Sequence, residues 1–231
     1  MCGRYTLFAS PATLERHLGA SVPSAFEPRY NCAPGQELFV LRDDDPGTLR
    51  RAEWGFTPEW AEESMDLINA RAETVADKPA FRSAFETRRC VVPADGFYEW
   101  ADRGGGKRPY RVAFEDDRPF AMAGLWTRWT PPTTQTSLGA FGEDDREDAA
   151  VECFTVVTTE PNGVVEPLHR RMAVILDDDE VARWLAADTP AAELQAMLDT
   201  HPGDEMTATP ASDRVGDPSN DDPELLAAEG G

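Results

Sequence analysis

The stretch RCVVPADGFYEWADRGGGKRPYRVAFEDDRPFAMAGLW, residues 89–126, decides the fold class of this chain. It contains four short runs rich in β-branched and aromatic residues, and such runs between turn-forming residues are typical of β-strands. A turn with three consecutive glycines, at 103–107, separates the second run from the third. The stretch therefore predicts strands at 89–93, 97–101, 110–114 and 120–126.

Both flanks of this stretch predict further strands and short helices. A helix is expected at 11–18, because Ser10 is a capping residue, Pro11 suits the first helical position and Gly19 ends the pattern. Other helices are expected at 78–87, from 178 or 179 to 187, and at 189–199. Other strands are expected at 38–42, 49–54, 153–158, 172–176 and 206–210. Many strands joined by short turns predict a mixed α/β (α+β) fold, β-dominated, with a barrel-like curled sheet and flanking helices.

The length of 231 residues suits one hydrophobic core, so a single domain is expected over residues 1–225. The stretch after residue 213 is acidic and rich in Gly and Pro, and its end, 226–231, is expected to be a flexible tail. Residues 127–150 are rich in Thr, Pro, Gly and acidic residues, which predicts a long surface loop.

The charge of the chain is strongly negative, with 43 acidic and 22 basic residues and a formal net charge of −21. Only Lys78 and Lys107 are lysines. An acidic surface with Arg in place of Lys suits the salt-rich cytoplasm of a halophilic organism, because high net charge keeps proteins soluble there. The alternative is an acidic surface that repels partners without any adaptation to salt.

The sequence contains no run of about 18 apolar residues and no secretory signal, so a cytoplasmic location is expected. The four cysteines, Cys2, Cys32, Cys90 and Cys153, form no CxxC pair. Neither a metal site nor any other cofactor is therefore expected. The last three cysteines lie beside apolar or β-branched residues, which predicts small buried side chains.

Cys2 follows directly after the initiator Met1. If Met1 is removed, Cys2 carries a free α-amine and a thiol on adjacent carbons, and in short peptides such groups have pKa values of about 8 and about 8.5. The amine condenses with an aldehyde to a Schiff base, and the thiol then closes a five-membered thiazolidine ring. Taken alone, a cysteine at position 2 is more simply an accident of the start site.

Three polar clusters lie further along the chain. Asn69, Arg71 and Glu73 occupy alternate positions and share one face in extended chain, where Arg71 offers a fork for phosphate or simply pairs with the glutamate. Glu99 lies among three aromatic residues, and an apolar surround raises a carboxyl pKa toward neutrality. His169 precedes an apolar strand, where active-site residues often project; the alternative is a satisfied surface histidine beside two exposed arginines.

Two further segments hold aromatic and proline residues near arginine, at 29–34 and 54–60. Exposed Trp and Pro side chains at such places stack on nucleic acid bases. Trp54 and Phe56 are expected in the core, whereas Trp60 is expected to be exposed.

Taken together, these motifs and their order resemble the SRAP family, the SOS-response-associated peptidases, also called abasic site processing proteins. The resemblance extends from Cys2 to about residue 225. It rests on Met1-Cys2-Gly3-Arg4, Arg29-Tyr30-Asn31-x-Ala33-Pro34, Trp54-Gly55, Asn69-Ala70-Arg71-x-Glu73, Gly96-Phe97-Tyr98-Glu99-Trp100 and His169-x-Arg171-Met172.

The resemblance implies a single-stranded DNA groove, removal of Met1, and a covalent thiazolidine between Cys2 and the opened sugar of an abasic site. It implies that Asn69 orients the nucleophile, that Glu99 transfers protons, and that His169 helps to open the sugar and supports reversal. It implies phosphate contacts for Arg4, Arg71 and Arg171, and base stacking or wedging for Pro34 and Trp60. The expected partner is single-stranded DNA with abasic sites, bound by a monomer.

Two positions depart from the family pattern. Ala173 stands where a proline usually follows the His-x-Arg-Met motif, and Asp217 stands where the family tends to have Asn. Two other functions remain open: an N-terminal-nucleophile amidohydrolase, in which the thiol attacks an amide and the amine acts as base, and a non-catalytic reader of modified bases.

Overall fold

The structure is a computed structural model that describes residues 2–102, 104, 106–131 and 150–227. The strands are β1 (Tyr5–Leu7), β2 (Arg29–Cys32), β3 (Glu37–Arg42), β4 (Asp45–Trp54), β5 (Asn69–Arg71), β6 (Arg89–Ala94), β7 (Gly96–Asp102), β8 (Lys107–Phe114), β9 (Phe120–Trp129), β10 (Val151–Thr159), β11 (Met172–Ala173), β12 (Ile175–Leu176) and β13 (Met206–Pro210). The helices are α1 (Pro11–Leu18), α2 (Arg82–Thr87), α4 (Asp178–Leu185) and α5 (Ala191–Ala196), with 3-10 helices η1 (Asp213–Gly216) and η2 (Pro223–Leu226).

The larger sheet closes on itself. It has the strand order β11-β10-β4-β3-β6-β9-β12, and β10 pairs with β9 as well as with β4. Strands β4, β3, β6, β9 and β10 therefore form a closed ring, and β5 pairs with β10 outside it. This confirms the predicted β-dominated α+β fold with a curled, barrel-like sheet.

No described helix has the length and apolar character that crossing a bilayer requires.

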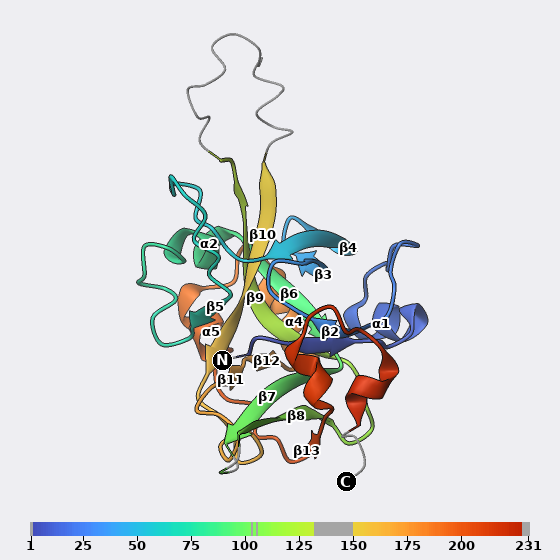
Figure 1. The fold of residues 1–231 in the computed structure, drawn as a ribbon. Helices are drawn as coiled ribbons and strands as arrows, with labels where there is room; N and C mark the ends of the chain where they lie inside the picture. The colour runs from blue at the N-terminus through green and yellow to red at the C-terminus, as the bar shows by residue number, and fades with distance from the viewer. Residues whose placement is uncertain (1, 103, 105, 132–149, 228–231) are drawn as a thin grey trace, which may run out of the picture.

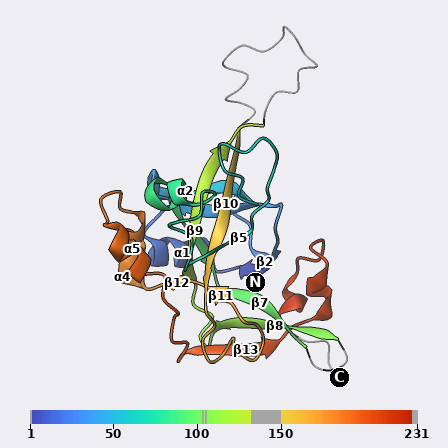
Figure 2. The ribbon, with the colours of Figure 1, turned by 90° about the vertical axis from the view of Figure 1, so that its left-hand side faces the viewer.

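The second sheet has the order β13-β8-β7-β1-β2 and lies beside the ring, as Figure 1 shows. Figure 2 shows α1, α2, α4 and α5 on one side of the barrel and the C-terminal 3-10 helices on the other. In both views β9 and β10 project as a two-stranded ribbon beyond the rest of the described molecule. One apolar core joins the two sheets and includes Trp54, Phe97 and Phe154.

Most predicted elements are present, with shifted ends. Helix α1 has the predicted bounds, and Ser10 Oγ accepts the Thr13 amide as its cap. Helix α2 begins at Arg82 instead of residue 78, because residues 78–81 form turns, and Asp177 caps α4 in place of 178 or 179. The predicted strand 172–176 is divided at Val174, which exchanges backbone hydrogen bonds with Val157 and Ala123.

The predicted loop at 127–150 starts later than expected, while its predicted end at 150 agrees with the structure. Strand β9 continues to Trp129, β10 starts at Val151, and residues 132–149 lie outside the described residues. Cys32, Cys90 and Cys153 are buried and unpaired, as expected, and Trp54 and Phe56 are buried in the core. The domain boundary at 225 stays a prediction, since 228–231 also lie outside the described part of the chain.

The C-terminal segment is docked rather than frayed up to Leu226. Asn31 Nδ2 donates to the carbonyls of Val215, Asp217 and Asn220, at 3.3, 3.1 and 2.9 Å. In return, Asp221 accepts the amides of Tyr30 and Asn31 and the guanidinium of Arg29. Both 3-10 helices start within the predicted domain, and β2 supplies partners for backbone groups of this segment that would otherwise be unsatisfied.

The N-terminal strand is anchored on its other side by Asp95. This buried carboxylate accepts Thr6 Oγ1 at 2.6 Å and the amides of Phe8 and Ala9 at 2.5 and 2.8 Å. Arg111 Nη2 donates to the Asp95 carbonyl at 2.6 Å, and a Cβ at Gly96 would lie only 2.5 Å from Arg111 Nε. The bare glycine backbone therefore lets Arg111 pack against the start of β7, and β1 is held between β2 and β7.

Candidate active site

Cys2 precedes β1 and has no exposed surface. Asn69 Nδ2 donates to its carbonyl oxygen at 2.9 Å. Burial raises the pKa of the Cys2 thiol well above its usual range, and the nearby Glu99 carboxylate raises it further. In a chain that still carries Met1, Cys2 is therefore a protonated thiol rather than a nucleophilic thiolate.

Asn69 lies at the start of β5, which runs parallel to β10 with Val156 opposite Asn69. Its Nδ2 is used by Cys2, but its buried Oδ1 has no hydrogen-bond partner among the described residues. An unmade hydrogen bond at a buried acceptor costs about 1–3 kcal/mol. A donor supplied by the α-amine or by a substrate hydroxyl would remove this cost, so the amide is suited to orienting reacting groups.

Glu99 lies on β7, beside β1, and only 2% of its surface is exposed. Burial raises the pKa of the Glu99 carboxyl to about 7. At neutral pH this carboxyl therefore exists in comparable amounts of acid and base, which is the condition for efficient proton transfer. The apolar surround expected from its aromatic neighbours in sequence accounts for this shift.

His169 reaches the same place from the loop between β10 and β11. Its Nδ1 is 3.8 Å from Glu99 Oε1 and 3.1 Å from both the amide nitrogen and the carbonyl oxygen of Arg171. Burial lowers the pKa of the His169 imidazole, so its neutral form dominates near neutral pH. The fold thus brings Glu99 and His169 together, and Asn69 holds Cys2 beside them.

The three arginines predicted to bind phosphate differ in their surroundings. Arg71 is exposed on β5. Arg4 donates to the carbonyls of Val215 and Gly216 at 2.5 and 3.3 Å, so its guanidinium caps η1. Arg171 pairs with both carboxylate oxygens of Glu73 and donates to the Thr158 carbonyl. Two of the three guanidinium groups thus have hydrogen-bond partners within the chain.

Pro34 and Trp60, predicted to contact bases, are both exposed. Trp60 is 63% exposed, in a loop tied down by a hydrogen bond from Trp129 Nε1 to the Ala61 carbonyl at 2.8 Å. An ion pair of 2.9 Å between Arg88 and Glu59 holds the same loop. An exposed indole on an anchored loop is suited to stacking, and its role stays a prediction.

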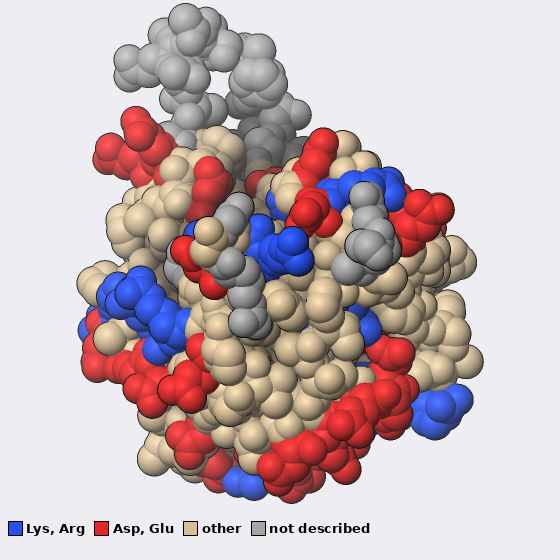
Figure 3. All heavy atoms as spheres, turned by 60° about the horizontal axis from the view of Figure 1, so that its bottom comes forward, with Lys and Arg blue, Asp and Glu red and all other residues tan. Residues whose placement is uncertain are grey.

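Figure 3 shows acidic side chains gathered in broad bands on one face, with basic side chains in separate smaller patches.

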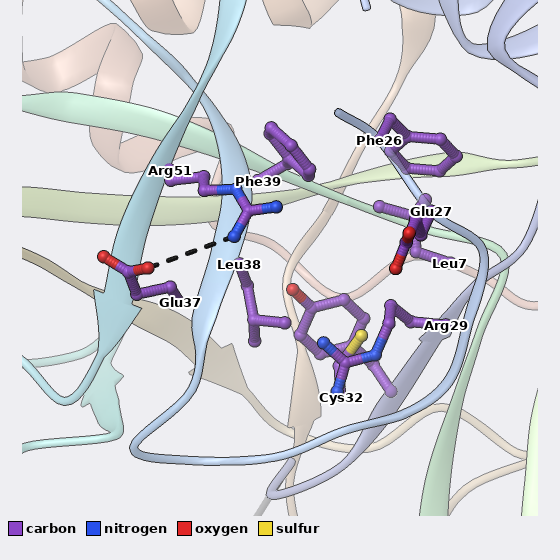
Figure 4. A pocket seen from close by; sticks show the side chains of 10 residues that line it. Leu7, Phe26, Glu27, Arg29, Cys32, Glu37, Leu38, Phe39 and Arg51 are labelled. Carbon is purple, nitrogen blue, oxygen red and sulfur yellow. Dashed lines mark ion pairs between the residues drawn. The ribbon is translucent and has the colours of Figure 1, made fainter. Parts of the chain in front are cut away.

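A small cavity of about 50 Å³, drawn in Figure 4, lies between β1, β2 and β3, apart from the candidate active site. Tyr5, Cys32 and Arg29 line it, and Arg51 pairs with Glu37 at 4.0 Å at its edge. It contains none of the predicted catalytic residues, and in the described part of the chain no cluster of His, Cys, Asp or Glu is arranged for a metal ion.

The sequence pattern of the family described as SOS response associated peptidase (SRAP) matches residues 1–218 of this chain. The chain belongs to the SRAP family. Abasic site processing protein YoqW of Bacillus subtilis is 34% identical over 235 residues, covering 98% of this chain and 99% of YoqW. Abasic site processing protein YoaM of the same organism is 34% identical over 238 residues, covering 99% of both chains.

A crystal structure of a protein from Bacteroides thetaiotaomicron shares the fold of this SRAP chain, with a TM-score of 0.83 and 24% identity. The similarity covers 99% of this chain and 100% of the other.

The departure at Asp217 is accommodated in this SRAP chain by the docked segment. Its carboxylate accepts Ser219 N and Oγ at 2.9 and 2.8 Å, while its carbonyl accepts Asn31 Nδ2.

Sequence reasoning missed the residues that support this SRAP site, namely Asn31, Asp95, Asp221 and the pairing of Glu73 with Arg171. Each acts on a partner that lies 86 to 192 residues away in the chain. Asn31 lies within the Arg-Tyr-Asn motif, directly before the buried Cys32 and Ala33. A polar amide next to apolar positions was the one sequence signal that this side chain needs buried hydrogen-bond partners.

Proposed function

We propose that this chain captures abasic sites in single-stranded DNA by forming a thiazolidine at Cys2 after Met1 is removed. The observation that carries the proposal is the convergence of Cys2, Asn69, Glu99 and His169 from four distant segments. Glu99 is close enough for its charge to raise the pKa of the Cys2 thiol, and His169 Nδ1 lies 3.8 Å from Glu99. The relatives YoqW and YoaM, both named abasic site processing proteins, support the choice of substrate.

The proposed reaction joins an amine, an aldehyde and a thiol with loss of one water. His169 gives a proton to the ring oxygen of the abasic sugar while the C1 hydroxyl loses its proton to the emptied imidazole nitrogen, and the ring opens to the aldehyde. The Cys2 α-amine attacks the aldehyde carbon, Glu99 transfers a proton to the departing hydroxyl, and water leaves a Schiff base. The Cys2 thiol then gives its proton to the Glu99 carboxylate as sulfur adds to the carbon of the protonated Schiff base, and the ring nitrogen keeps the one proton it already carries.

Positioning supplies much of the proposed rate. Asn69 holds the Cys2 carbonyl at 2.9 Å, which fixes the amine and thiol relative to the incoming aldehyde. Holding reactants in the right geometry replaces a bimolecular encounter by an effectively unimolecular step. The chain is therefore a thiol-dependent crosslinking enzyme in this proposal, and reversal of the adduct would use the same Glu99 and His169 in the opposite direction.

Removal of Met1 is a required first step in the proposal. It exposes the α-amine, and either self-cleavage at the Met1–Cys2 bond or an aminopeptidase would achieve it. We assign the peptidase part of the family description to this step.

We infer that DNA attachment in this chain depends mainly on base stacking and on the covalent bond. The net charge of the chain is −21, and two of the three candidate phosphate-binding arginines, Arg4 and Arg171, already bind groups within the chain. The gain in DNA affinity from counterion release is therefore small. This also suits a salt-rich cytoplasm, in which the chain would act as a monomer.

The test is intact-mass spectrometry of the untagged protein with and without abasic single-stranded DNA. The wild-type chain should lack Met1 and gain the mass of the DNA minus one water, and Cys153→Ala, which alters another buried cysteine, should behave the same. Cys2→Ala and a chain with a residual N-terminal tag should form no adduct. A stable adduct on Cys2→Ala would refute the proposal.

The same experiment separates the two other functions. A reader of modified bases would keep its affinity for DNA without Cys2 and form no adduct with the wild-type chain. An amidohydrolase would have no need of the Glu99–His169 pair and would give an acyl adduct with amide substrates instead.

A further inference from the structure

Arg171 is the point at which three segments around the candidate site meet. Its guanidinium pairs with both oxygens of Glu73, one of them at 3.0 Å, and also donates to the Thr158 carbonyl. Only 15% of the Arg171 side chain is exposed, compared with 48% for Glu73. A two-pronged arginine–carboxylate pair fixes orientation as well as distance, so Glu73 determines where this arginine lies.

The backbone of the same arginine holds the imidazole of His169. The Arg171 amide nitrogen lies 3.1 Å from His169 Nδ1, and the Arg171 carbonyl oxygen lies at the same distance. Neutral Nδ1 accepts from the amide, and protonated Nδ1 donates to the carbonyl. Both protonation states of His169 therefore depend on the placement of one residue's backbone, that of Arg171.

Glu73 also belongs to the segment that carries Asn69. It follows β5 by two residues, and β5 lies alongside β10 with Arg71 opposite Thr158. The Thr158 carbonyl accepts the Ala72 amide at 2.9 Å and also accepts Arg171 Nη2. The pair of Glu73 and Arg171 thus joins the strand that orients Cys2 to the loop that carries His169.

We propose that Glu73 is a positioning residue for the crosslinking reaction, which acts by holding the Arg171 backbone against the imidazole of His169. This inference rests on the proposed function, because it assigns Glu73 a part in that reaction. Glu73 touches neither Cys2 nor Glu99 in the described contacts, so its effect passes through Arg171.

The proposal predicts the direction of change at His169. The charged groups around this imidazole are Glu99, Arg170, Lys107 and the amino terminus of the chain, together with the Arg171 backbone, whose hydrogen bond favours the protonated form. In Glu73→Gln the Arg171 charge loses its counter-charge and the Arg171 backbone loses its anchor. Both changes disfavour protonated His169, so its pKa should fall.

The first measurement is an NMR titration of the three histidines in DNA-free protein, with His169 identified by comparison with His169→Gln. The pKa of His169 should be lower in Glu73→Gln than in the wild type by at least about half a unit, and Glu73→Asp should restore part of the shift. Glu193→Gln, which removes the carboxylate of the Arg183–Glu193 pair between α4 and α5, is the matched control and should leave His169 unchanged, because neither residue of that pair contacts Arg171 in the described contacts.

The second measurement is the single-turnover crosslinking rate as a function of pH. The rate should fall about tenfold at neutral pH in Glu73→Gln, with the alkaline limb moved to lower pH. In the Cys2→Ala background, Glu73→Gln should bind single-stranded DNA at least as tightly as Cys2→Ala alone, because it removes no predicted DNA contact and releases the Arg171 guanidinium. A slower crosslinking rate therefore cannot come from weaker binding.

An unchanged His169 titration in Glu73→Gln overturns the inference, whether or not the wild type forms an adduct. A rate loss matched by Glu193→Gln, or explained by a lower melting temperature alone, also overturns it. Absence of any adduct in the wild type would instead contradict the proposed function, while the titration would still test the positioning by Glu73.

Discussion

At the scale of single residues, Glu99 shows how burial adjusts an acid to its task. The carboxyl is 2% exposed, and burial raises its pKa to about 7. In the unfolded chain a glutamate titrates near about 4.3. Between these two values the folded state binds more protons than the unfolded state, so stability falls as pH rises through this window.

Replacing Glu99 by Gln should therefore stabilise the protein above pH 7, where the buried carboxylate is ionised in the wild type. A shift from about 4.3 to about 7 corresponds to at most about 4 kcal/mol, and the difference should vanish below about pH 4. Urea denaturation at pH 4, 6 and 8 measures it. Equal stability of the two proteins at pH 8 would show that the Glu99 carboxylate is well solvated.

Crosslinking by the same variant should slow by about 100-fold, since general acid–base groups contribute about 10²–10⁴ to rates. A Glu99→Gln protein that is more stable but crosslinks more slowly is the result expected if the Glu99 carboxyl serves the reaction and lowers the stability of the fold.

At the scale of elements, the C-terminal segment and β2 stabilise one another. Asp221 satisfies two β2 amides and Arg29, while Asn31 satisfies three carbonyls of the segment. Arg4 adds hydrogen bonds to the carbonyls of η1. The segment therefore holds the residues next to Cys2, even though its composition is typical of a frayed end.

Asp221→Ala should lower the free energy of unfolding by about 2–4 kcal/mol, because it leaves two amides and a guanidinium without their acceptor. Thermal denaturation and limited proteolysis of the C-terminal segment measure this change. Asp188→Ala, at an exposed position between α4 and α5, is the control and should change stability by less than about 0.5 kcal/mol. A matching small effect for Asp221→Ala would contradict the docking role.

The elements also differ in how well the sequence predicts them. The strands within 89–126 and helix α1 carry strong local signals, namely apolar alternation, turn residues and caps. Strands β1, β2 and β5 have only three or four residues and become strands through their partners in the sheets. Short strands of this kind have no periodicity of their own, so sequence reasoning missed them.

At the scale of the whole molecule, the negative charge and the choice of a polyanionic substrate oppose one another. Acidic bands cover much of the face in Figure 3. A protein that relied on phosphate contacts would lose affinity steeply with salt. The proposed covalent capture would remove this dependence once the bond has formed.

Crosslink yield on abasic single-stranded DNA should therefore fall by less than about twofold between 0.1 and 1 M KCl. Gel quantification after a fixed time, with the non-covalent affinity of Cys2→Ala as a parallel measurement, tests this. A crosslink yield at background level in 1 M KCl would show that phosphate contacts dominate DNA binding. It would contradict the inference that attachment depends mainly on base stacking and the covalent bond.

The sequence by itself determined the fold class and the motifs of the family, and it predicted Cys2 as the nucleophile, because these depend on local composition and on the order of motifs. The tertiary structure alone decided that Asn69, Glu99 and His169 gather around Cys2, that burial brings the Glu99 pKa to about 7, and that Asp221 and Glu73 hold the supporting loops. The gathering of these residues arises from contacts between distant segments, which no local pattern in the chain encodes. The aromatic neighbours of Glu99 predicted the direction of its pKa shift, whereas the exclusion of water by the whole fold sets its size.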